Sequence, residues 1–304
     1  MQLSTIIVSW NTRDLLARCL ESLFAHPPRA SFEVLVIDNA SSDGSSEAVQ
    51  ERFPQVRLIQ NAENSGFAAA TNRGILESDG TFILLLNPDT EIQAGALQTL
   101  LDVLESHPEY GMVGPRLLNP DGSLQESCYP APTLSREVWR LFHLDRLVPH
   151  AIYPMSKWSP NQIRSVDVLK GACVLLRREV IEQVGLLDES FFMYSEEVDL
   201  CLRVRRAGWQ LAWVPQACVI HYEGQSTRQA SREMFIRLYA GKVGYYRKHH
   251  GWWSVQAYKL ILLLASLVRL AITPLAFFEH PPARQAHLAL SGKYRRLLSV
   301  LYGL

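Results

Sequence analysis

The first 90 residues alternate between short apolar runs and segments with helical spacing, and this alternation constrains the fold more than any other feature. Segments 14–24 and 67–78 place apolar residues at helical intervals between the runs. The runs, rich in β-branched residues and of strand length, are STIIVSW (4–10), FEVLVID (32–38), VRLI (56–59) and FILLL (82–86). Strands that alternate with helices predict an α/β fold, with a mainly parallel sheet flanked by helices on both faces.

Polar residues stand at the end of each of these runs or in the loop that follows it. Ligands of open α/β sheets bind at the carboxyl ends of the strands, so we expect these side chains to contribute to one binding site. In chain order the residues are Ser9, Asn11, Asp38, Asn39, Asn61, Asn64, Asn87 and Asp89.

The loop VIDNASSDGS (36–45) admits two interpretations. It can form a turn rich in Asp, Asn and Ser that also caps a helix beginning near Ser45. Alternatively, Asp38 can accept a hydrogen bond from the imide of a nucleobase, a task suited to a carboxylate held at a strand end. The loop alone does not decide between the two.

The segment NAENSGFAAATNRGI (61–75) places Asn64 and Gly66 before a helix rich in small residues. A glycine turn at the start of a helix explains this pattern structurally. The functional alternative is that the backbone comes close to a ligand at Gly66, where no side chain intervenes. The segment is not a phosphate-binding loop, because it contains neither GxxxxGK nor GxGxxG.

The segment LLLNPDTEI (84–92) places Asp89 at the end of a buried strand, which Pro88 terminates because proline cannot donate to a sheet ladder. A carboxylate at this edge is suited to a hard divalent cation that bridges to phosphates. The alternative, Asp89 as the N-cap of a helix beginning near Ala94, is weakened by the four intervening residues. Asn87 occupies a position where a second carboxylate would bind a cation more strongly.

Three acids lie within four residues in SEEVDL (195–200): Glu196, Glu197 and Asp199. They could stabilise a helix N-terminus through its dipole. Alternatively, mutual repulsion raises the pKa of at least one, which suits a general base near neutral pH. In VIHYEGQST (219–227), His221 follows a strand, where a neutral imidazole could complete a metal site or simply occupy a core or surface position.

The charge distribution divides the chain. Residues 228–304 carry 12 Lys and Arg against two acids, a net charge of +10, whereas residues 1–227 have a net charge of −10. We therefore expect a catalytic domain over 1–227 and a basic, amphipathic helical tail over 228–304, with membrane or nucleic acid as partner. Five cysteines without a CxxC pair favour a reducing compartment. Residues 115–165 predict a long irregular segment with a short helix near 136–144.

The tail contains LILLLASLVRLAITPLAFF (260–278), which would be about 28 Å long as a helix. Its 12 Leu, Ile, Val and Phe contribute about −5 kcal/mol to insertion against about +3 kcal/mol for Arg269, which is marginal for spanning. An interfacial helix fits better; a single membrane span and a soluble layer or dimer contact remain the alternatives. The residues expected at the lipid surface are Lys242, Tyr245, Tyr246, Arg247, Lys248, Trp252 and Trp253.

Six motifs in this order resemble those of a family 2 glycosyltransferase of the GT-A fold, in its rhamnosyltransferase-like branch, over residues 3–227. They are IIVSWN, VIDNASSDGS, NSGFAAATNRGI, LLLNPDTEI, FFMYSEEVDLCLRVRRAGW and HYEGQST. The resemblance implies inverting transfer of a sugar, with rhamnose favoured, from a dTDP- or UDP-linked donor. The implied acceptor is a hydroxyl of a lipid-linked or polysaccharide substrate, and the implied cofactor is Mg²⁺ or Mn²⁺.

By position in these motifs, the resemblance implies that Asp38 reads the base, Asp89 and His221 bind the metal, and Glu197 is the catalytic base. Two residues depart from the family pattern: Asn87 replaces the first acid of the DXD-like motif, and Glu197 replaces the usual Asp. From the N-terminus and the basic tail we expect a peripheral location on the cytoplasmic face of the membrane, with no nucleic-acid partner and a possible homodimer. A nucleotidyltransferase and a non-catalytic membrane scaffold are the competing hypotheses.

Overall fold

The computed structural model describes residues 2–223 and 231–304. The chain divides into two compact units. The first consists of Met1–Ala131 and Tyr153–Gln229, and the second of Pro132–Ile152 and Ala230–Leu304. The boundary expected from the sequence, between residues 227 and 228, lies outside the described residues.

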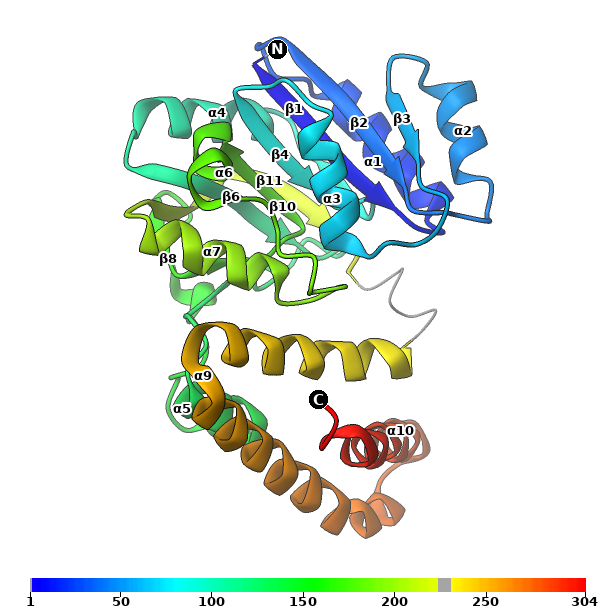
Figure 1. Ribbon diagram of the computed structural model, residues 1–304, viewed down its shortest axis with the longest axis vertical. Coiled ribbons are helices and arrows are strands. Elements are labelled where there is room, and N and C mark those ends of the chain that lie inside the picture. Colours follow the sequence, from blue (N-terminus) through cyan, green and yellow to red (C-terminus); the bar gives the residue numbers. More distant parts are fainter. Residues whose placement is uncertain (1, 224–230) are drawn as a thin grey trace. The chain divides into compact units, whose positions relative to one another are not determined.

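The first unit contains a mixed, mostly parallel sheet of strand order β3-β2-β1-β4-β10-β6-β11-β5, with β8 paired to β11 (Figure 1). Its strands are β1 (Leu3–Ser9), β2 (Phe32–Asp38), β3 (Arg57–Gln60), β4 (Phe82–Leu86), β5 (Thr90–Ile92), β6 (Tyr110–Leu118), β8 (Arg164–Val166), β10 (Cys173–Arg177) and β11 (Gln210–His221). Strand β10 runs antiparallel to β4 and β6, and β5 and β8 run antiparallel to β11. Strands β7 (Cys128–Tyr129) and β9 (Val168–Leu169) form a separate ribbon.

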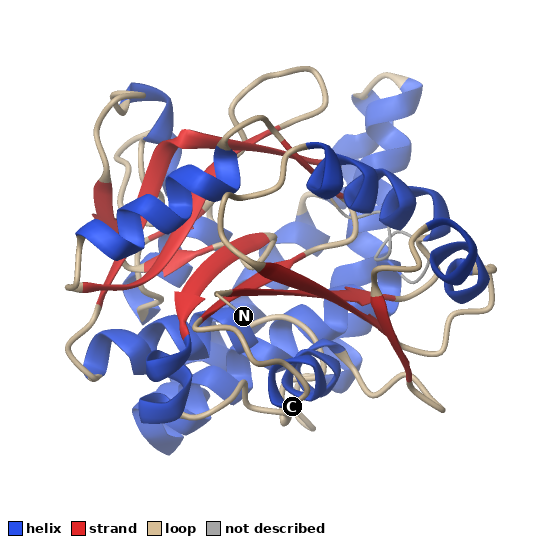
Figure 2. Cartoon of the chain, turned by 90° about the horizontal axis from the view of Figure 1, so that it is seen from above, coloured by secondary structure: helices blue, strands red, loops and turns tan. Residues whose placement is uncertain are grey.

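Helices cover both faces of this sheet, as Figure 2 shows from above. They are α1 (Arg13–Ala25), α2 (Ser45–Arg52), α3 (Phe67–Leu76), α4 (Ala96–Ser106), α6 (Arg178–Val184) and α7 (Glu196–Arg206). Alternate residues of β1 serve the two faces: Ile7 packs in the core beneath α1 and α4, and Ile6 in the core beneath α3 and α7. This two-residue period buries both faces of the strand and confirms the α/β architecture expected from the sequence.

The parallel strands end in register, which brings their following loops to one edge of the sheet. Ser9 of β1 pairs with Asp38 of β2, and Asp38 pairs with Gln60 of β3. Strand β4 is aligned with β1 through the pair Ile7 and Leu86. The loops that carry the expected polar residues therefore start at the same edge.

The second unit is helical and contains α5 (Leu134–Leu141), α9 (Ser231–Ala271) and α10 (Pro281–Val300). Its first segment is Pro132–Ile152, which the charge distribution of the sequence places in the catalytic domain. The reason for the difference is a buried charge on α5, since Glu137 accepts a hydrogen bond from Lys242 of α9 at 2.7 Å. Burial alone would raise the pKa of Glu137, but the charges of Lys242 and Arg140 hold it at about 2.

Helix α9 bends at Gly251, whose backbone is left-handed (φ 78°). Before the bend, Tyr245 and Tyr246 are buried and Lys242 pairs with Glu137, so the expectation that these three face lipid is wrong. Their side chains pack inside the second unit because α9 needs a buried face against its neighbours. After the bend, Trp252 and Trp253 are exposed, as expected.

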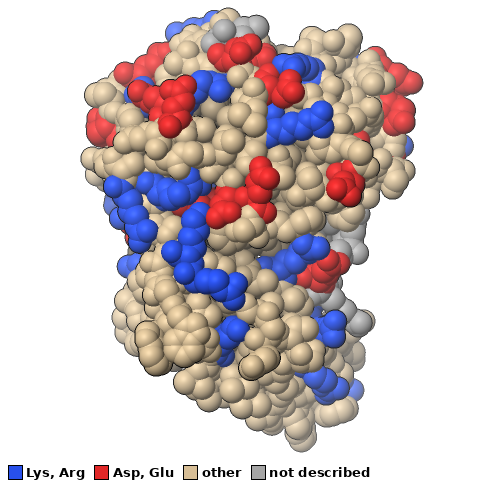
Figure 3. Space-filling view, in the orientation of Figure 1, with Lys and Arg blue, Asp and Glu red and all other residues tan. Residues whose placement is uncertain are grey.

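The part of α9 after the bend carries an exposed apolar stripe on one face. Its members follow the intervals of a single helix face: Leu260, Leu263, Leu264, Leu267 and Val268. On the opposite face, Leu262 and Ala265 are buried. On the side drawn in Figure 3, the C-terminal helices show broad uncharged surface with scattered Lys and Arg.

Glu233–Phe278 is long and apolar enough to cross a membrane by length and composition, and only 22% of its most apolar window is buried. Arg269, the single charged residue of the apolar segment 260–278, contacts the His143 side chain of the same unit. The sequence-based objection to a membrane span, the cost of a central arginine, is therefore reduced because this cation has a protein partner.

Candidate active site

Asp89 and His221 are brought together by the pairing of β5 with β11, in which His221 is aligned with Thr90. Asp89 Oδ1 lies 3.3 Å from His221 Nε2, and the two residues are 6% and 3% exposed. Asp89 is not a helix cap, because α4 begins at Ala96 behind Gly95. The structural alternative weighed for Asp89 is thus excluded, and its carboxylate lies at the carboxyl edge of the sheet.

This pair fits a divalent cation. A carboxylate oxygen and an imidazole nitrogen are ligands that Mn²⁺ accepts, and Mg²⁺ is commonly held by one or two carboxylates together with phosphates and water. Among the described residues, no group of three His, Cys, Asp or Glu side chains forms a metal site. The chain would therefore supply part of a coordination shell, and a phosphorylated substrate and water would supply the rest.

Asn87 shapes the turn that carries Asp89. Its backbone N–H donates to Ala172, and its carbonyl accepts from the Thr90 hydroxyl at 2.7 Å. Asn87 thus lies near Asp89 at the strand end. A contact of its side chain with the nucleotide-sugar donor stays a prediction.

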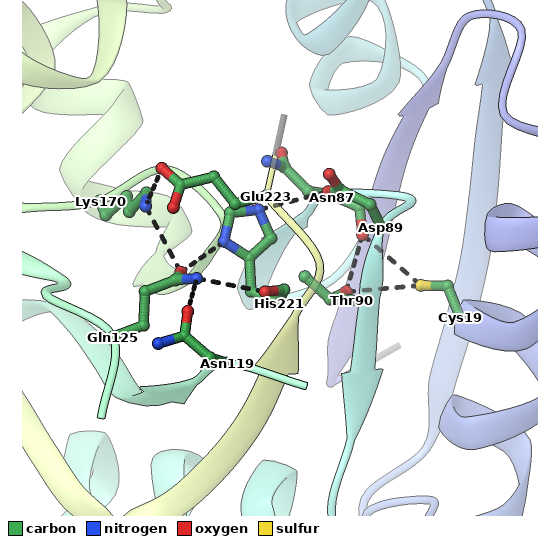
Figure 4. A network of polar contacts seen from close by, with 9 residues as sticks. All are labelled: Cys19, Asn87, Asp89, Thr90, Asn119, Gln125, Lys170, His221 and Glu223. Atoms are coloured by element: carbon green, nitrogen blue, oxygen red, sulfur yellow. Dashed lines mark hydrogen bonds and ion pairs between the residues drawn. The ribbon is translucent and has the colours of Figure 1, made fainter. Parts of the chain in front are cut away.

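A polar network surrounds the other side of the histidine ring (Figure 4). His221 Nδ1 lies 2.7 Å from Gln125 Oε1, and Lys170 Nζ lies 3.4 Å from the same oxygen. Lys170 also pairs with Glu223 at 2.7 Å. The network links the loop after β6, the end of β9 and the end of β11.

The acids at the start of α7 fall into two groups. Glu196 is buried, Glu197 is partly buried, and the Oε2 atom of each is buried without a hydrogen-bond partner. Asp199 is fully buried and accepts from Arg203 at 2.8 Å. Arg203 also donates to the carbonyls of Val184 and Leu186, so Asp199 helps to anchor α7 on α6.

The environment raises the pKa of both glutamates. Burial is the main cause for each, and the neighbouring Glu197 charge raises the pKa of Glu196 further. Hydrogen bonds from the backbone N–H groups at the helix start and the Lys170 charge partly oppose the rise for Glu197. Glu197 also lies against Gly171: a Cβ added at Gly171 would lie 3.5 Å from the Cβ of Glu197. Glu197 therefore combines partial exposure, a raised pKa and a nearby ammonium, a combination suited to accepting a proton.

On the opposite side of the edge, Asp38 is buried and already hydrogen-bonded. Its carboxylate accepts from the Ser46 hydroxyl at 2.7 Å and from the Ser41 N–H at 3.3 Å. A carboxylate offers about four lone-pair positions, so these contacts leave acceptor capacity. Asp43 also binds the start of α2, through Ser45. The base contact of Asp38 stays a prediction.

Asn64 and Gly66 form a turn held by Asn39. Asn39 Nδ2 donates to Asn64 Oδ1 at 2.9 Å and to the Gly66 carbonyl at 3.2 Å. Gly66 has φ 86°, and an added Cβ would meet the Phe192 carbonyl at 2.6 Å. The close approach expected at Gly66 is thus made to the chain's own Phe192, and a ligand contact there stays a prediction.

Ser9 and Asn11 occupy the loop after β1. The Ser9 hydroxyl is buried against Thr12 Oγ1 at 2.9 Å. Asn11 Oδ1 accepts from the Ser42 N–H at 2.8 Å, which joins the loops after β1 and β2. The structure therefore shows both side chains organising the loops of this edge, and their contacts with a donor remain predicted.

Non-glycine residues with left-handed backbone concentrate around this edge. Such conformations cost about 1–3 kcal/mol each and persist where the surroundings impose them, often at functional sites. At this edge they are Asn11, Ala40, Tyr194, Ser195 and Glu223. Two in succession, at Tyr194 and Ser195, set the start of α7 and hence the positions of Glu196 and Glu197.

Three residues of this region were not identified as active-site residues from the sequence: Asn39, Gln125 and Lys170. Asn39 stood among the polar residues at the strand ends but without a role. Gln125 lies in the irregular segment, and its partner His221 is 96 residues away, so no local pattern connects them. Lys170 adjoins Gly171 before β10, and a lone lysine there carries no distinguishing signal.

The family model described as "Glycosyl transferase family 2" matches residues 4–185. The chain is 32% identical over 272 residues to an N-acetylglucosaminyl-diphospho-decaprenol L-rhamnosyltransferase of Mycobacterium tuberculosis, covering 83% of this chain and 86% of that protein. It is 28% identical over 238 residues to the rhamnosyltransferase WbbL of Escherichia coli K12, covering 76% and 87%.

Among solved structures, the chain resembles the mannosyltransferase PcManGT of Pyrobaculum calidifontis, in complex with GDP-Man and Mn²⁺. The TM-score is 0.58 at 18% identity, covering 99% of this chain and 87% of that one. The GT-A fold expected from the sequence is thereby confirmed.

Proposed function

Because this chain belongs to glycosyl transferase family 2, we propose that it transfers a sugar, with inversion, from a nucleoside diphosphate donor to an acceptor hydroxyl. The observation that carries the proposal is the pair Asp89 and His221, 3.3 Å apart at the carboxyl edge of the sheet. In this proposal Asp38, Asn64 and Asn87 would contact the donor, and Glu197 would contact the acceptor.

Asp89 and His221 would hold Mg²⁺ or Mn²⁺ on the donor diphosphate. The bound cation would stabilise the negative charge that the leaving group gains as the glycosidic bond breaks. Support comes from the chemistry of the two ligands and from the Mn²⁺ in the related mannosyltransferase structure.

Glu197 would act as the general base. The acceptor oxygen forms its bond to the anomeric carbon as the bond to the diphosphate breaks, and the proton of that hydroxyl passes to Glu197. Glu197 is preferred to Glu196 because it is the more exposed of the two. It is preferred to Asp199 because the latter is fully buried and paired with Arg203.

The relatives support a donor and an acceptor class. Both are named rhamnosyltransferases, and the mycobacterial enzyme is named for a diphospho-decaprenol acceptor that carries N-acetylglucosamine. We propose an activated rhamnose, of the dTDP-linked kind, as donor and a lipid-linked glycan as acceptor.

A lipid-linked acceptor agrees with a membrane role for the second unit. The apolar stripe of α9, the exposed Trp252 and Trp253 and the basic composition of residues 228–304 would place this unit in an anionic interface. We propose a peripheral location on the cytoplasmic face; the five cysteines are all free, which agrees with a reducing compartment. A single span by α9 is the alternative.

The test is a panel of dTDP-, UDP- and GDP-sugars, each incubated with full-length protein, Mg²⁺ or Mn²⁺ and a polyprenyl diphosphate that carries N-acetylglucosamine. We expect release of the nucleoside diphosphate and a lipid product one sugar longer, with dTDP-rhamnose the best donor. A parallel reaction contains a nucleoside triphosphate and a sugar 1-phosphate; formation of a nucleotide sugar with release of pyrophosphate would support the nucleotidyltransferase hypothesis instead. No turnover of any donor would support the scaffold hypothesis.

A further inference from the structure

The ring of His221 is held at its second nitrogen by Gln125. His221 Nδ1 lies 2.7 Å from Gln125 Oε1, and both side chains are buried. In metal sites, the hydrogen bond at the nitrogen that does not bind the metal sets the histidine tautomer and orientation. Whether the oxygen or the nitrogen of the Gln125 amide faces the ring therefore decides whether Nε2 carries a hydrogen or a free lone pair.

The orientation of the Gln125 amide is determined by two groups with only one possible role. Gln125 Nε2 donates to the backbone carbonyl of His221 at 3.2 Å, and a carbonyl can only accept. Lys170 Nζ lies 3.4 Å from Gln125 Oε1, and an ammonium can only donate. Asn119 Oδ1 gives Nε2 a second acceptor at 2.9 Å. The amide oxygen therefore faces the histidine ring, as Figure 4 shows.

An amide oxygen facing Nδ1 requires the hydrogen of the neutral ring to be on Nδ1. Nε2 then presents its lone pair toward Asp89 Oδ1, 3.3 Å away. In the neutral ring, two electron-pair donors that face each other at this distance in a buried position repel unless a proton or a metal cation joins them. The opposite tautomer would donate a hydrogen bond from Nε2 to Asp89. The Nε2 lone pair would then be absent, and a metal could not bind at this nitrogen.

We propose that Gln125 is a positioning residue that keeps His221 in the tautomer with hydrogen on Nδ1, so that Nε2 is available to a divalent cation beside Asp89. The proposal rests on the metal site of the proposed function. In this role Gln125 acts on the cation through the imidazole of His221. Lys170 assists by contacting the Gln125 amide oxygen, and its second contact, with Glu223, keeps its ammonium at that position.

The first test reads the tautomer directly. Nitrogen-15 shifts of the histidine rings are recorded on the full chain at pH 8, and the His221 signals are identified by their loss in His221→Asn. We expect a protonated Nδ1 and an unprotonated Nε2 in the wild type. A protonated Nε2 with a bare Nδ1 would overturn the proposal without any reference to activity.

The second test uses Gln125→Met, which keeps the length of the side chain and removes the amide oxygen. We expect the Mn²⁺ dissociation constant, measured by electron paramagnetic resonance with thymidine diphosphate present, to rise about 10- to 100-fold. The His221 shifts should change toward protonated Nε2. Gln125→Glu keeps an acceptor for Nδ1 and should stay within a few-fold of the wild type.

The matched control is Gln55→Met, the same substitution at an exposed glutamine. Wild-type Mn²⁺ affinity and unchanged His221 shifts in folded Gln125→Met would overturn the proposal. If Gln125→Met fails to fold, Gln125→Glu and the wild-type shifts decide. Absence of Mn²⁺ binding to the wild type would refute the proposed metal site, whereas turnover without an effect of Gln125 on affinity would refute only the positioning role.

Discussion

His221 Nε2 points at Asp89 Oδ1 from 3.3 Å, and antiparallel pairing of β11 with β5 creates this approach. The short edge strand β5 pairs with the end of β11 and thereby brings the carboxylate of Asp89 close to His221, which is distant in sequence. Both side chains are buried, so water competes weakly with any ligand placed between them. Their electrostatic effect on that ligand is correspondingly strong.

Asp89→Ala should abolish metal-dependent transfer and leave the fold intact. The carboxylate lies at the strand edge, and the backbone contacts of its turn do not require its side chain. Transfer with Mn²⁺ and the thermal unfolding midpoint are measured together. Asp79→Ala, at an exposed aspartate, is the control.

His221→Ala should be milder than Asp89→Ala, because water can occupy a vacated ligand position. The measurement is the Mn²⁺ concentration needed for half-maximal transfer, which should rise. Near-normal activity of Asp89→Ala, or loss of activity only through unfolding, would contradict the metal assignment. An unchanged metal requirement in His221→Ala would remove the histidine from the site.

Glu197→Gln should lower kcat by about 10²-fold or more with nearly unchanged donor binding, because the amide keeps the shape and cannot take a proton. Only the ionised form of Glu197 is a base, and burial raises its pKa above the usual carboxyl value. Wild-type kcat should therefore rise with pH through that raised pKa. The variant should lack this rise of kcat with pH, the acid limb of the pH profile.

Glu196→Gln and Asp199→Asn distinguish the three acids. Asp199→Asn weakens the pair with Arg203, so its main effect should be a lower unfolding temperature. The base would have to be reassigned if Glu196→Gln lost both kcat and the acid limb while Glu197→Gln stayed active.

Replacing Leu263, Leu264 and Leu267 by glutamate should weaken binding to anionic vesicles at least tenfold, because the apolar stripe becomes charged like the lipid. Co-sedimentation with vesicles of phosphatidylglycerol and phosphatidylethanolamine measures the change. Leu76→Glu, at an exposed leucine of the first unit, should have no effect. Equal sedimentation of the wild type and the triple variant would refute the membrane role of this stripe.

Ending the chain after Ser226 should yield a soluble domain with slow donor hydrolysis only if residues 132–152 are also replaced by a glycine-serine linker. Without α9, the buried Glu137 and the apolar side of α5 lose their partners. Size-exclusion chromatography of the two truncated forms measures the difference. A monodisperse, active protein that retains residues 132–152 would contradict this role of α5.

The sequence predicted the sheet and the edge where the candidate site lies, because strand and helix periods are local and strand ends carry visible polar residues. It did not predict the role of Gln125, which depends on pairing between distant segments. Tyr245 and Tyr246 were misplaced for a related reason: a helix pattern shows which residues are apolar but not which face a partner covers. Helix α5, within residues 132–152, packs on α9 from elsewhere in the chain, and Tyr246 packs on Tyr258 of α9 itself.

The backbone contact between Gly66 and Phe192 has a consequence for redesign. Phe67 N–H donates to the Phe192 carbonyl at 2.8 Å, and the space at Gly66 is closed by the same residue. The turn beside the expected nucleotide pocket is therefore built onto the loop that leads into α7 and Glu197. To change sugar preference by replacing residues 61–66 with those of a relative, residues 190–195 would have to be replaced together with them. The two segments contact each other through their backbones, so each depends on the other for its conformation.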